Sequence, residues 1–213
     1  MKKKDLLKDA VRHIDIKSFD ATDIIEGMRG MSFTARDTAK ACDILNEMIS
    51  DKDCTIILCI AGSTSAGGCM DIYADMVRSK MVDVIVATGA SIVDMDFFEA
   101  LGFRHYKGTP HVEDGRLREL YIDRIYDTFI DEEQLQICDN TVEAIADSLD
   151  PGIYSSREFI TQMGKYLTTK AKKRDCLVLA AYENDVPIFC PAFSDSSAGF
   201  GLVKHQAANP KNH

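Results

Sequence analysis

This sequence has no long hydrophobic run, no closely paired cysteines and no surplus of positive charge. Each of these absences argues against a class of protein. No stretch of about 18 apolar residues occurs, so a transmembrane helix is not expected. The basic N-terminus is not followed by an apolar segment, which argues against a signal peptide. The formal net charge is −9. Nucleic acid is therefore disfavoured as the main partner, because phosphate binding needs clustered cations.

The seven cysteines and five histidines lack the spacing of a metal site. None of the cysteines forms a Cys-x-x-Cys pair, and their number is odd. We therefore expect reduced thiols in a cytoplasmic protein, with Cys59 and Cys190 buried inside apolar runs. Neither a disulfide framework nor a bound metal is expected.

Length and composition indicate one folded domain with an apolar core. The chain has 213 residues, of which 46% are hydrophobic and 28% are charged. These proportions are ordinary for a globular protein. The sequence contains no internal repeat and no low-complexity linker. We predict a single domain over residues 1–213, in which residues 207–213 form a disordered tail.

Three apolar runs are typical of strands. Cys54–Ala61 and Val82–Ala87 are continuous runs of β-forming residues, which favour burial on both faces of a parallel sheet, and a third strand is expected at 187–191. Residues 102–116 contain Gly, His and Pro and predict irregular structure. The expected helices are 5–13, 34–50, 69–80, 95–101, 117–130, 132–148, 155–168 and 176–184. This alternation predicts an α/β fold with a parallel sheet and right-handed crossovers.

A Gly-rich turn, Ala61–Gly68, follows the first strand and precedes a helix. Glycine lets the backbone turn tightly and approach a ligand closely, and the following helix N-terminus favours an anion such as a pyrophosphate. The turn is not Gly-x-Gly-x-x-Gly, lacks the Lys of a P-loop, and has Ser63 where a nucleophile elbow has Gly. The context favours nucleotide binding, and the alternative is a tight turn without a ligand.

Two further polar segments follow the other strands. Thr88–Ser91 comes after the second strand, and Asp195 lies in the Ser-rich stretch after the third. Because ligands of open α/β sheets bind at the carboxyl ends of the strands, the turns after the first and second strands are candidates to line one crevice. Asp94 is suited either to a ribose hydroxyl or to capping the next helix. Asp195 is suited to a ligand or to capping a turn, and the residues alone favour the turn.

Three motifs together resemble the deoxyhypusine synthases, most closely their bacterial deoxyhypusine synthase-like branch. They are Ala-Gly-Ser-Thr-Ser-Ala-Gly at 61–67, Met-Val-Asp-Val-Ile-Val-Ala-Thr-Gly-Ala at 81–90, and Pro-Ile-Phe-Cys-Pro-Ala-Phe-Ser-Asp at 187–195. The resemblance covers about residues 10–210. It implies a Rossmann-like fold with helices on both faces of the parallel sheet. It also implies a homotetramer with sites between subunits.

The chemistry that the resemblance implies is NAD-dependent aminobutyl transfer. NAD dehydrogenates spermidine, 1,3-diaminopropane leaves, and an enzyme lysine holds the aminobutyl group as an imine before transfer to an acceptor amine. The acceptor is a lysine of a translation factor or, in relatives, a small amine. The positions that match NAD contacts of the family are Ala61, Gly62, Ser63, Thr64, Ser65, Thr88, Gly89, Ala90, Asp94 and Asp195.

The sequence also departs from the family pattern. Two acidic polyamine contacts of the family fall on Val93 and Phe200, and the Trp-Gly-Lys context of the catalytic lysine is absent. Lys204 does not stand in that context. We expect a C-terminally truncated or naturally short transferase. The alternatives are a non-catalytic paralogue that joins a complete subunit, and an ordinary NAD-dependent oxidoreductase on a small substrate.

Overall fold

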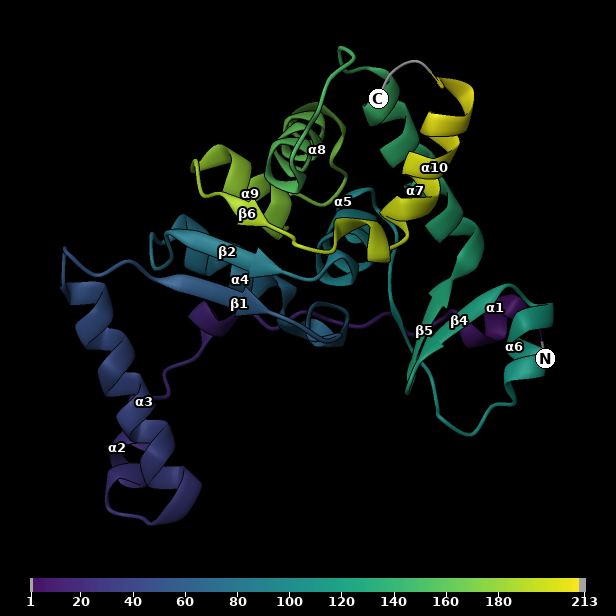
Figure 1. Cartoon of the computed structure of the whole chain (residues 1–213). Helices are drawn as coiled ribbons and strands as arrows, with labels where there is room; N and C mark the ends of the chain where they lie inside the picture. The colour runs from purple at the N-terminus through teal and green to yellow at the C-terminus, as the bar shows by residue number, and fades with distance from the viewer. Residues whose placement is uncertain (1, 211–213) are drawn as a thin grey trace.

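The computed structural model describes residues 2–210. It contains a parallel sheet, a smaller antiparallel sheet and helices around both (Figure 1). The strands are β1 (Ile57–Ile60), β2 (Val84–Ala87), β3 (Tyr106–Lys107), β4 (Ile122–Ile125), β5 (Thr128–Asp131) and β6 (Ile188–Phe189). The α-helices are α1 (Lys3–Leu6), α2 (Thr22–Arg29), α3 (Phe33–Ser50), α4 (Met70–Arg78), α5 (Phe98–Ala100), α6 (Asp114–Glu119), α7 (Glu132–Asp147), α8 (Ser156–Lys170), α9 (Leu177–Glu183) and α10 (Ala198–Ala208). Shorter or irregular turns are η1 (Ile16–Ser18), η2 (Ser65–Cys69), η3 (Ala90–Phe97) and η4 (Phe193–Asp195).

The parallel sheet confirms the predicted α/β fold. Its order is β1-β2-β6, and all three strands run in the same direction. The side chains of Ile60, Ile85 and Ile188 belong to the main core, which also contains residues of α4, α8 and α9. The two crossovers from β1 to β2 and from β2 to β6 pass through these helices, as the alternation of elements predicts.

The predicted burial of the first strand on both faces is wrong. Ile57 is 55% exposed and Cys59 is also exposed, whereas Ile60 is buried. Phe189 on β6 is 39% exposed and pairs with Val86 on the same face. An apolar run therefore does not show by itself that both faces are covered, because it carries no polar side chain to mark the solvent side.

A β-hairpin replaces the helix predicted over 117–130. Strands β4 and β5 pair antiparallel, and β3 joins the other edge of β5. The turn between β4 and β5 contains Tyr126 with φ +53°, and Tyr121 before β4 has φ +54°. Positive φ usually requires Gly or Asn, so the sequence carried no turn signal here.

Several helices were predicted closely. Helices α3, α4, α7, α8 and α9 all lie within a few residues of their expected bounds. Helix α8 begins at the predicted capping box, in which the Ser155 hydroxyl accepts from the Glu158 amide and the Glu158 carboxylate accepts from the Ser155 amide. Helix α10 extends to Ala208, so the first two residues of the predicted tail are helical. Residues 211–213 of that tail lie outside the described residues.

The N-terminal region differs from its predicted helix. Only Lys3–Leu6 is helical, and residues 9–14, called here the N-terminal strap, run extended across the body. The Val11 amide donates to the His105 carbonyl, and the Ile14 amide donates to the Gly68 carbonyl. After the strap, α2 and α3 pack together and project away from the rest of the molecule (Figure 1). No helix within residues 2–210 is both long and apolar enough to cross a membrane.

Candidate functional site

The two polar turns predicted to line one crevice do line one cavity, together with the Ser-rich stretch after β6. They follow the carboxyl ends of β1, β2 and β6, and the cavity between them has a volume of about 500 Å³. Most of the lining consists of apolar side chains and backbone atoms, and Asp195 supplies one carboxylate. The lining residues are Cys59, Ile60, Ala61, Val86, Ala87, Thr88, Gly89, Ala90, Pro191, Ala192 and Asp195.

Hydrogen bonds join the first turn to the second. The Ser91 hydroxyl donates to the Gly62 carbonyl at 3.1 Å, and the hydroxyls of Thr88 and Ser91 lie 2.9 Å apart. Gly62 has φ +73°, and a Cβ added to it would meet no atom within 4 Å. The glycine therefore serves the left-handed backbone of the turn and leaves the space beside it open.

The third turn packs directly on the second. A Cβ added to Gly89 would lie 2.7 Å from the Ser196 Cβ and 3.0 Å from the Phe193 carbonyl oxygen. Only glycine permits this approach, which brings η4 to the edge of the cavity. Asp195 lies in η4 and lines the cavity, and no side-chain partner of its carboxylate is found among residues 2–210.

Other predicted site residues do not line this cavity. Thr64 accepts a hydrogen bond from the Tyr73 hydroxyl at 2.8 Å, and Ser65 is buried in η2. The Ser63 carbonyl accepts from the Gly67 amide and closes the turn. These contacts stabilise the first turn itself.

Asp94 holds the start of a distant helix. Its carboxylate accepts from the Ser197 amide at 3.0 Å and from the Ser197 hydroxyl at 2.6 Å, next to the first residue of α10. Burial raises the pKa of Asp94, and the hydrogen bonds from Ser197 oppose that rise. Asp139 lies close by. Burial raises its pKa as well, and the Asp94 charge adds to this rise, whereas a hydrogen bond from Ser197 opposes it. In this conformation both carboxylates face the junction of η3, α7 and α10.

The two departures from the family pattern lie in different surroundings. Val93 is fully buried in η3, and its carbonyl accepts from the Cys138 thiol. Phe200 on α10 is 68% exposed. Neither position offers a carboxylate for an ammonium group.

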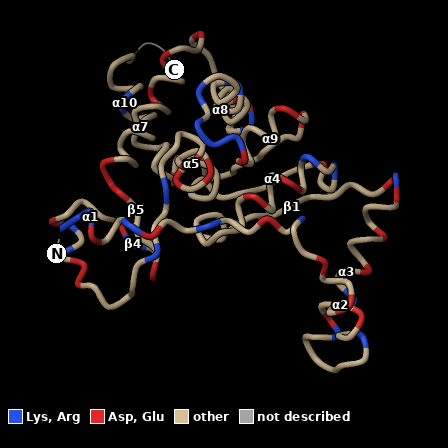
Figure 2. Tube along the Cα trace, turned by 180° about the vertical axis from the view of Figure 1, so that it is seen from behind, with Lys and Arg blue, Asp and Glu red and all other residues tan. Residues whose placement is uncertain are grey.

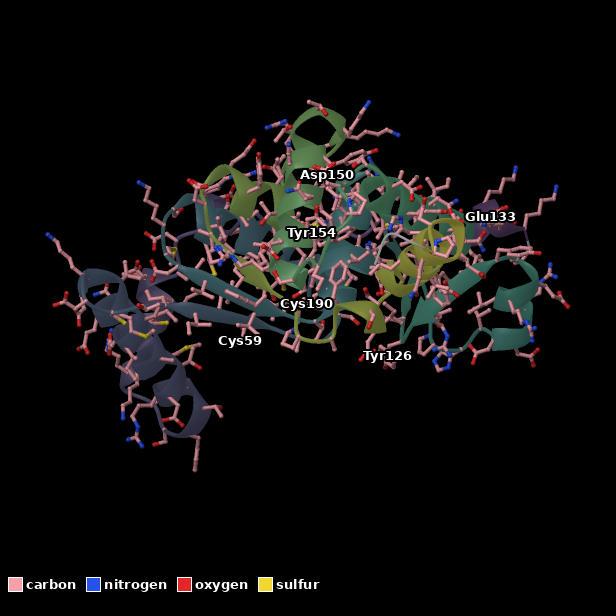
Figure 3. The ribbon with its side chains drawn as sticks, turned by 45° about the horizontal axis from the view of Figure 1, so that its top comes forward. Cys59, Tyr126, Glu133, Asp150, Tyr154 and Cys190 are labelled. Carbon is pink, nitrogen blue, oxygen red and sulfur yellow. The ribbon has the colours of Figure 1, made fainter. Side chains whose placement is uncertain are left out.

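A second cavity, of about 450 Å³, adjoins the first and shares Pro191 with it. Phe159, Phe193 and Leu202 give it apolar walls, and Asp150 adds a carboxylate. Figure 3 shows Cys190, Tyr154 and Asp150 along this side of the molecule, with Cys59 on β1. Sequence reasoning missed this cavity because its walls come from α7, α8, α10 and the loop 149–156, which no local pattern links.

The cysteines differ in accessibility. All seven are free; Cys138, Cys176 and Cys190 are buried, whereas Cys42 and Cys59 are exposed. The predicted burial of Cys59 is therefore wrong, because its strand has an open face. Burial raises the pKa of the Cys138 and Cys176 thiols. Within residues 2–210, no group of three or more His, Cys, Asp or Glu side chains is arranged to hold a metal ion.

The comparison with family models decides the family. The deoxyhypusine synthase model matches residues 23–213. The chain belongs to the deoxyhypusine synthase family. The chain spans about 60% of the length of the curated relatives that it matches.

Named relatives agree with this assignment. A deoxyhypusine synthase-like protein of Coxiella burnetii (strain RSA 493 / Nine Mile phase I) is 67% identical over 99% of this chain and 60% of its own length. One from Chlorobaculum tepidum is 54% identical over 100% of this chain and 61% of its own. "Probable deoxyhypusine synthase 2" of Methanosarcina acetivorans is 37% identical over 89% of this chain and 55% of its own length.

A solved structure shares the fold. The crystal structure of a candidate deoxyhypusine synthase from Entamoeba histolytica superposes with a TM-score of 0.65 at 19% identity. The match covers 94% of this chain and 68% of the other. At this identity the match bears on the fold alone, and it agrees with the parallel sheet and helices described above.

Proposed function

We propose that this protein is an NAD-dependent aminoalkyl transferase that acts on spermidine or a related polyamine. The observation that carries the proposal is the cavity at the carboxyl ends of β1, β2 and β6, with small residues along its walls and one unpaired carboxylate. Membership of the deoxyhypusine synthase family supports the same function. The family also supports a homo-oligomer, which we include in the proposal together with a cytoplasmic location.

The lining fits a dinucleotide. Ala61, Ala90 and Pro191 offer apolar surface to a planar base, and the Asp195 carboxylate is free to accept from ribose hydroxyls. Open space beside Gly62 lets a ligand approach the backbone. When bound, NAD supplies an acceptor for the hydride that leaves the carbon next to the amine. The protein groups would hold and orient the cofactor.

The second cavity suits an alkyl amine. Phe159, Phe193 and Leu202 can cover methylene groups, and Asp150 can pair with an ammonium. The shared residue Pro191 places this cavity beside the proposed cofactor site. A substrate that spans the two cavities would have its amine-bearing carbon close to the cofactor.

Substituting Asp195 tests the cofactor assignment. We expect the 213-residue chain to bind NAD and Asp195→Asn to weaken binding about tenfold, because hydrogen bonds to a charged acceptor contribute about 1.5–3 kcal/mol. Calorimetric titration measures the affinity. Asp185→Asn is the matched control, since Asp185 has φ +56°, which Asn tolerates, and lies outside the cavity. Equal affinities in both variants would remove Asp195 from the site.

Thiol labelling of Cys59 gives an independent test. We expect a thiol reagent to modify Cys42 and Cys59 within minutes and to leave the buried Cys138 and Cys176 unmodified. Saturating NAD should slow the modification of Cys59 severalfold, because Cys59 lines the cavity, and leave Cys42 on α3 unchanged. Mass spectrometry of labelled peptides gives the rates. If NAD binds without protecting Cys59, it binds elsewhere.

Turnover decides between catalysis and the non-catalytic alternative. A transferase should release 1,3-diaminopropane from spermidine when NAD is present, and chromatography of the amines detects it. Val93 and Phe200 stand where the resemblance places acids, and this departure fits either a changed substrate or an inactive partner subunit. NAD binding without turnover, together with co-purification with a longer homologue, would support that alternative.

A further inference from the structure

A buried ionic cluster lies apart from the cavities described above. The Glu99 carboxylate accepts from the His13 Nε2 and from the His105 Nδ1, each at 2.7 Å. The side chains of these three residues are at most 7% exposed. Burial raises the pKa of Glu99, but the hydrogen bonds from His105 and His13 outweigh it and hold that pKa below its ordinary value. Glu99 is therefore an anion with both of its oxygens occupied.

One ring nitrogen of His13 is left without a partner. Its Nε2 faces Glu99, whereas its Nδ1 is buried and has no hydrogen-bond partner. A buried polar atom without a partner is costly, so such atoms often mark a place where a ligand or water binds. His13 lies in the N-terminal strap, and its side chain lines a cavity of about 420 Å³.

Cations dominate the lining of this cavity. Arg104, Lys172 and Lys173 line it with one carboxylate, Glu99, which is already paired with the two histidines. Lys173 is itself held by Glu99 at 3.2 Å and by Asp71 at 3.0 Å. No hydrogen bond or ion pair joins the Arg104 or Lys172 side chain to another described residue. In Figure 2 the basic stretch that follows α8 lies beside α5. The remaining walls are Val11, Gly102 and Phe103.

The position of Lys172 is set by packing. Its amide donates to the Ala100 carbonyl at 2.8 Å. A Cβ added to Gly102, which has φ +95°, would lie 2.6 Å from the Lys172 Cδ and 2.9 Å from its Cβ. The glycine at the end of α5 therefore lets the lysine stem lie against the backbone and keeps its ammonium near the cavity.

We propose that this cavity binds the phosphate group of a small phosphorylated molecule. His13 Nδ1–H would donate to one phosphate oxygen, and Arg104 and Lys172 would supply charge-assisted donors to the others. A tetrahedral anion accepts from several directions, which suits donors that come from the strap, the segment after α5 and the segment after α8. The site shares no lining residue with the cavity at the strand ends.

Phosphate titration tests the site directly. Inorganic phosphate, titrated into the full chain at constant ionic strength and followed by calorimetry, should bind saturably at one site. Arg104→Ala and Lys172→Ala should each weaken binding at least about fivefold. Arg36→Ala is the matched control, because it removes the same charge from the projecting helix α3. Acetate, with one charge, should bind much more weakly than phosphate.

Substitution tests the role of His13. His13→Ala should weaken phosphate binding at least about fivefold, because the donor at Nδ1 is lost, and calorimetry measures the affinity. Circular dichroism should show that the variant is folded.

Three results would overturn the proposal. The first is the absence of saturable phosphate binding to the wild-type chain. The second is an equal loss of affinity in Arg36→Ala and Lys172→Ala, which would indicate a non-specific charge effect. The third is an unchanged phosphate affinity in a folded His13→Ala chain, which would exclude His13 as a donor. None of these depends on whether NAD binds, so the proposed function is tested separately.

Discussion

Gly164→Ala is expected to lower the free energy of unfolding by about 3 kcal/mol, the upper end of the usual cost of overpacking. Gly164 lies inside α8, which packs against α9. A Cβ at this position would lie 2.5 Å from the Tyr182 Cβ and 3.1 Å from the Val178 carbonyl oxygen. Both contacts are at or next to backbone, so the helices must separate to admit the methyl group. Urea unfolding followed by circular dichroism gives the value.

Gly27→Ala is the matched control for that substitution. Gly27 also lies inside a helix, α2, and an added Cβ would meet no atom within 4 Å. Alanine is the better helix former, so stability should rise by up to about 1 kcal/mol. A similar loss of stability in both variants would mean that close packing of α8 on α9 is not what Gly164 provides.

Removing Glu99 should cost about 3–5 kcal/mol, the usual result of breaking a buried ionic cluster. Glu99→Ala leaves His13, His105 and Lys173 without their shared carboxylate. Glu99→Gln should cost less, because the amide can still bond one of the rings. Chemical unfolding at pH 7 measures both, and Asp43→Ala serves as a control because its ion pair with Arg29 is exposed and should contribute little.

The pH dependence of the Glu99 effect follows from the sign of its pKa shift. The folded-state pKa lies below the ordinary value, so the unfolded chain binds the proton more readily than the folded one. The stabilisation is therefore complete above about pH 4.3 and is lost as the pH falls toward the folded-state pKa. The difference between the wild type and Glu99→Ala should be large at pH 7 and smaller at pH 3. A difference independent of pH would indicate that Glu99 acts only through packing.

The sequence predicted the elements that carry local signals. The Ser155 capping box fixed the start of α8, and the two apolar runs before Gly-containing turns became β1 and β2. Because parallel strands end at the same edge, the turns at Ala61 and Thr88 were expected to meet, and both line one cavity. Family resemblance added Asp195, for which the residues alone favoured a turn.

Features that depend on distant contacts could not be predicted. Tyr121 and Tyr126 take positive φ without Gly or Asn, so the hairpin of β4 and β5 had no turn signal. Asp94 bonds Ser197, 103 residues away, and therefore supports α10, not the helix that follows Asp94. His13 meets Glu99 across 86 residues, and no spacing rule links the two. In each case the tertiary structure, and not the local pattern, decides the role of the residue.

The N-terminal strap is made early on the ribosome and can dock along its full length only after a delay. Val11 bonds His105, which follows it by 94 residues. At about 5–20 residues per second, synthesis of that interval takes roughly 5–20 s. Gly68, which bonds Ile14, is made part-way through this interval, whereas Glu99 and His105 are made near its end. The first strand–turn–helix unit of the emerging chain is therefore complete before the strap has all of its anchors.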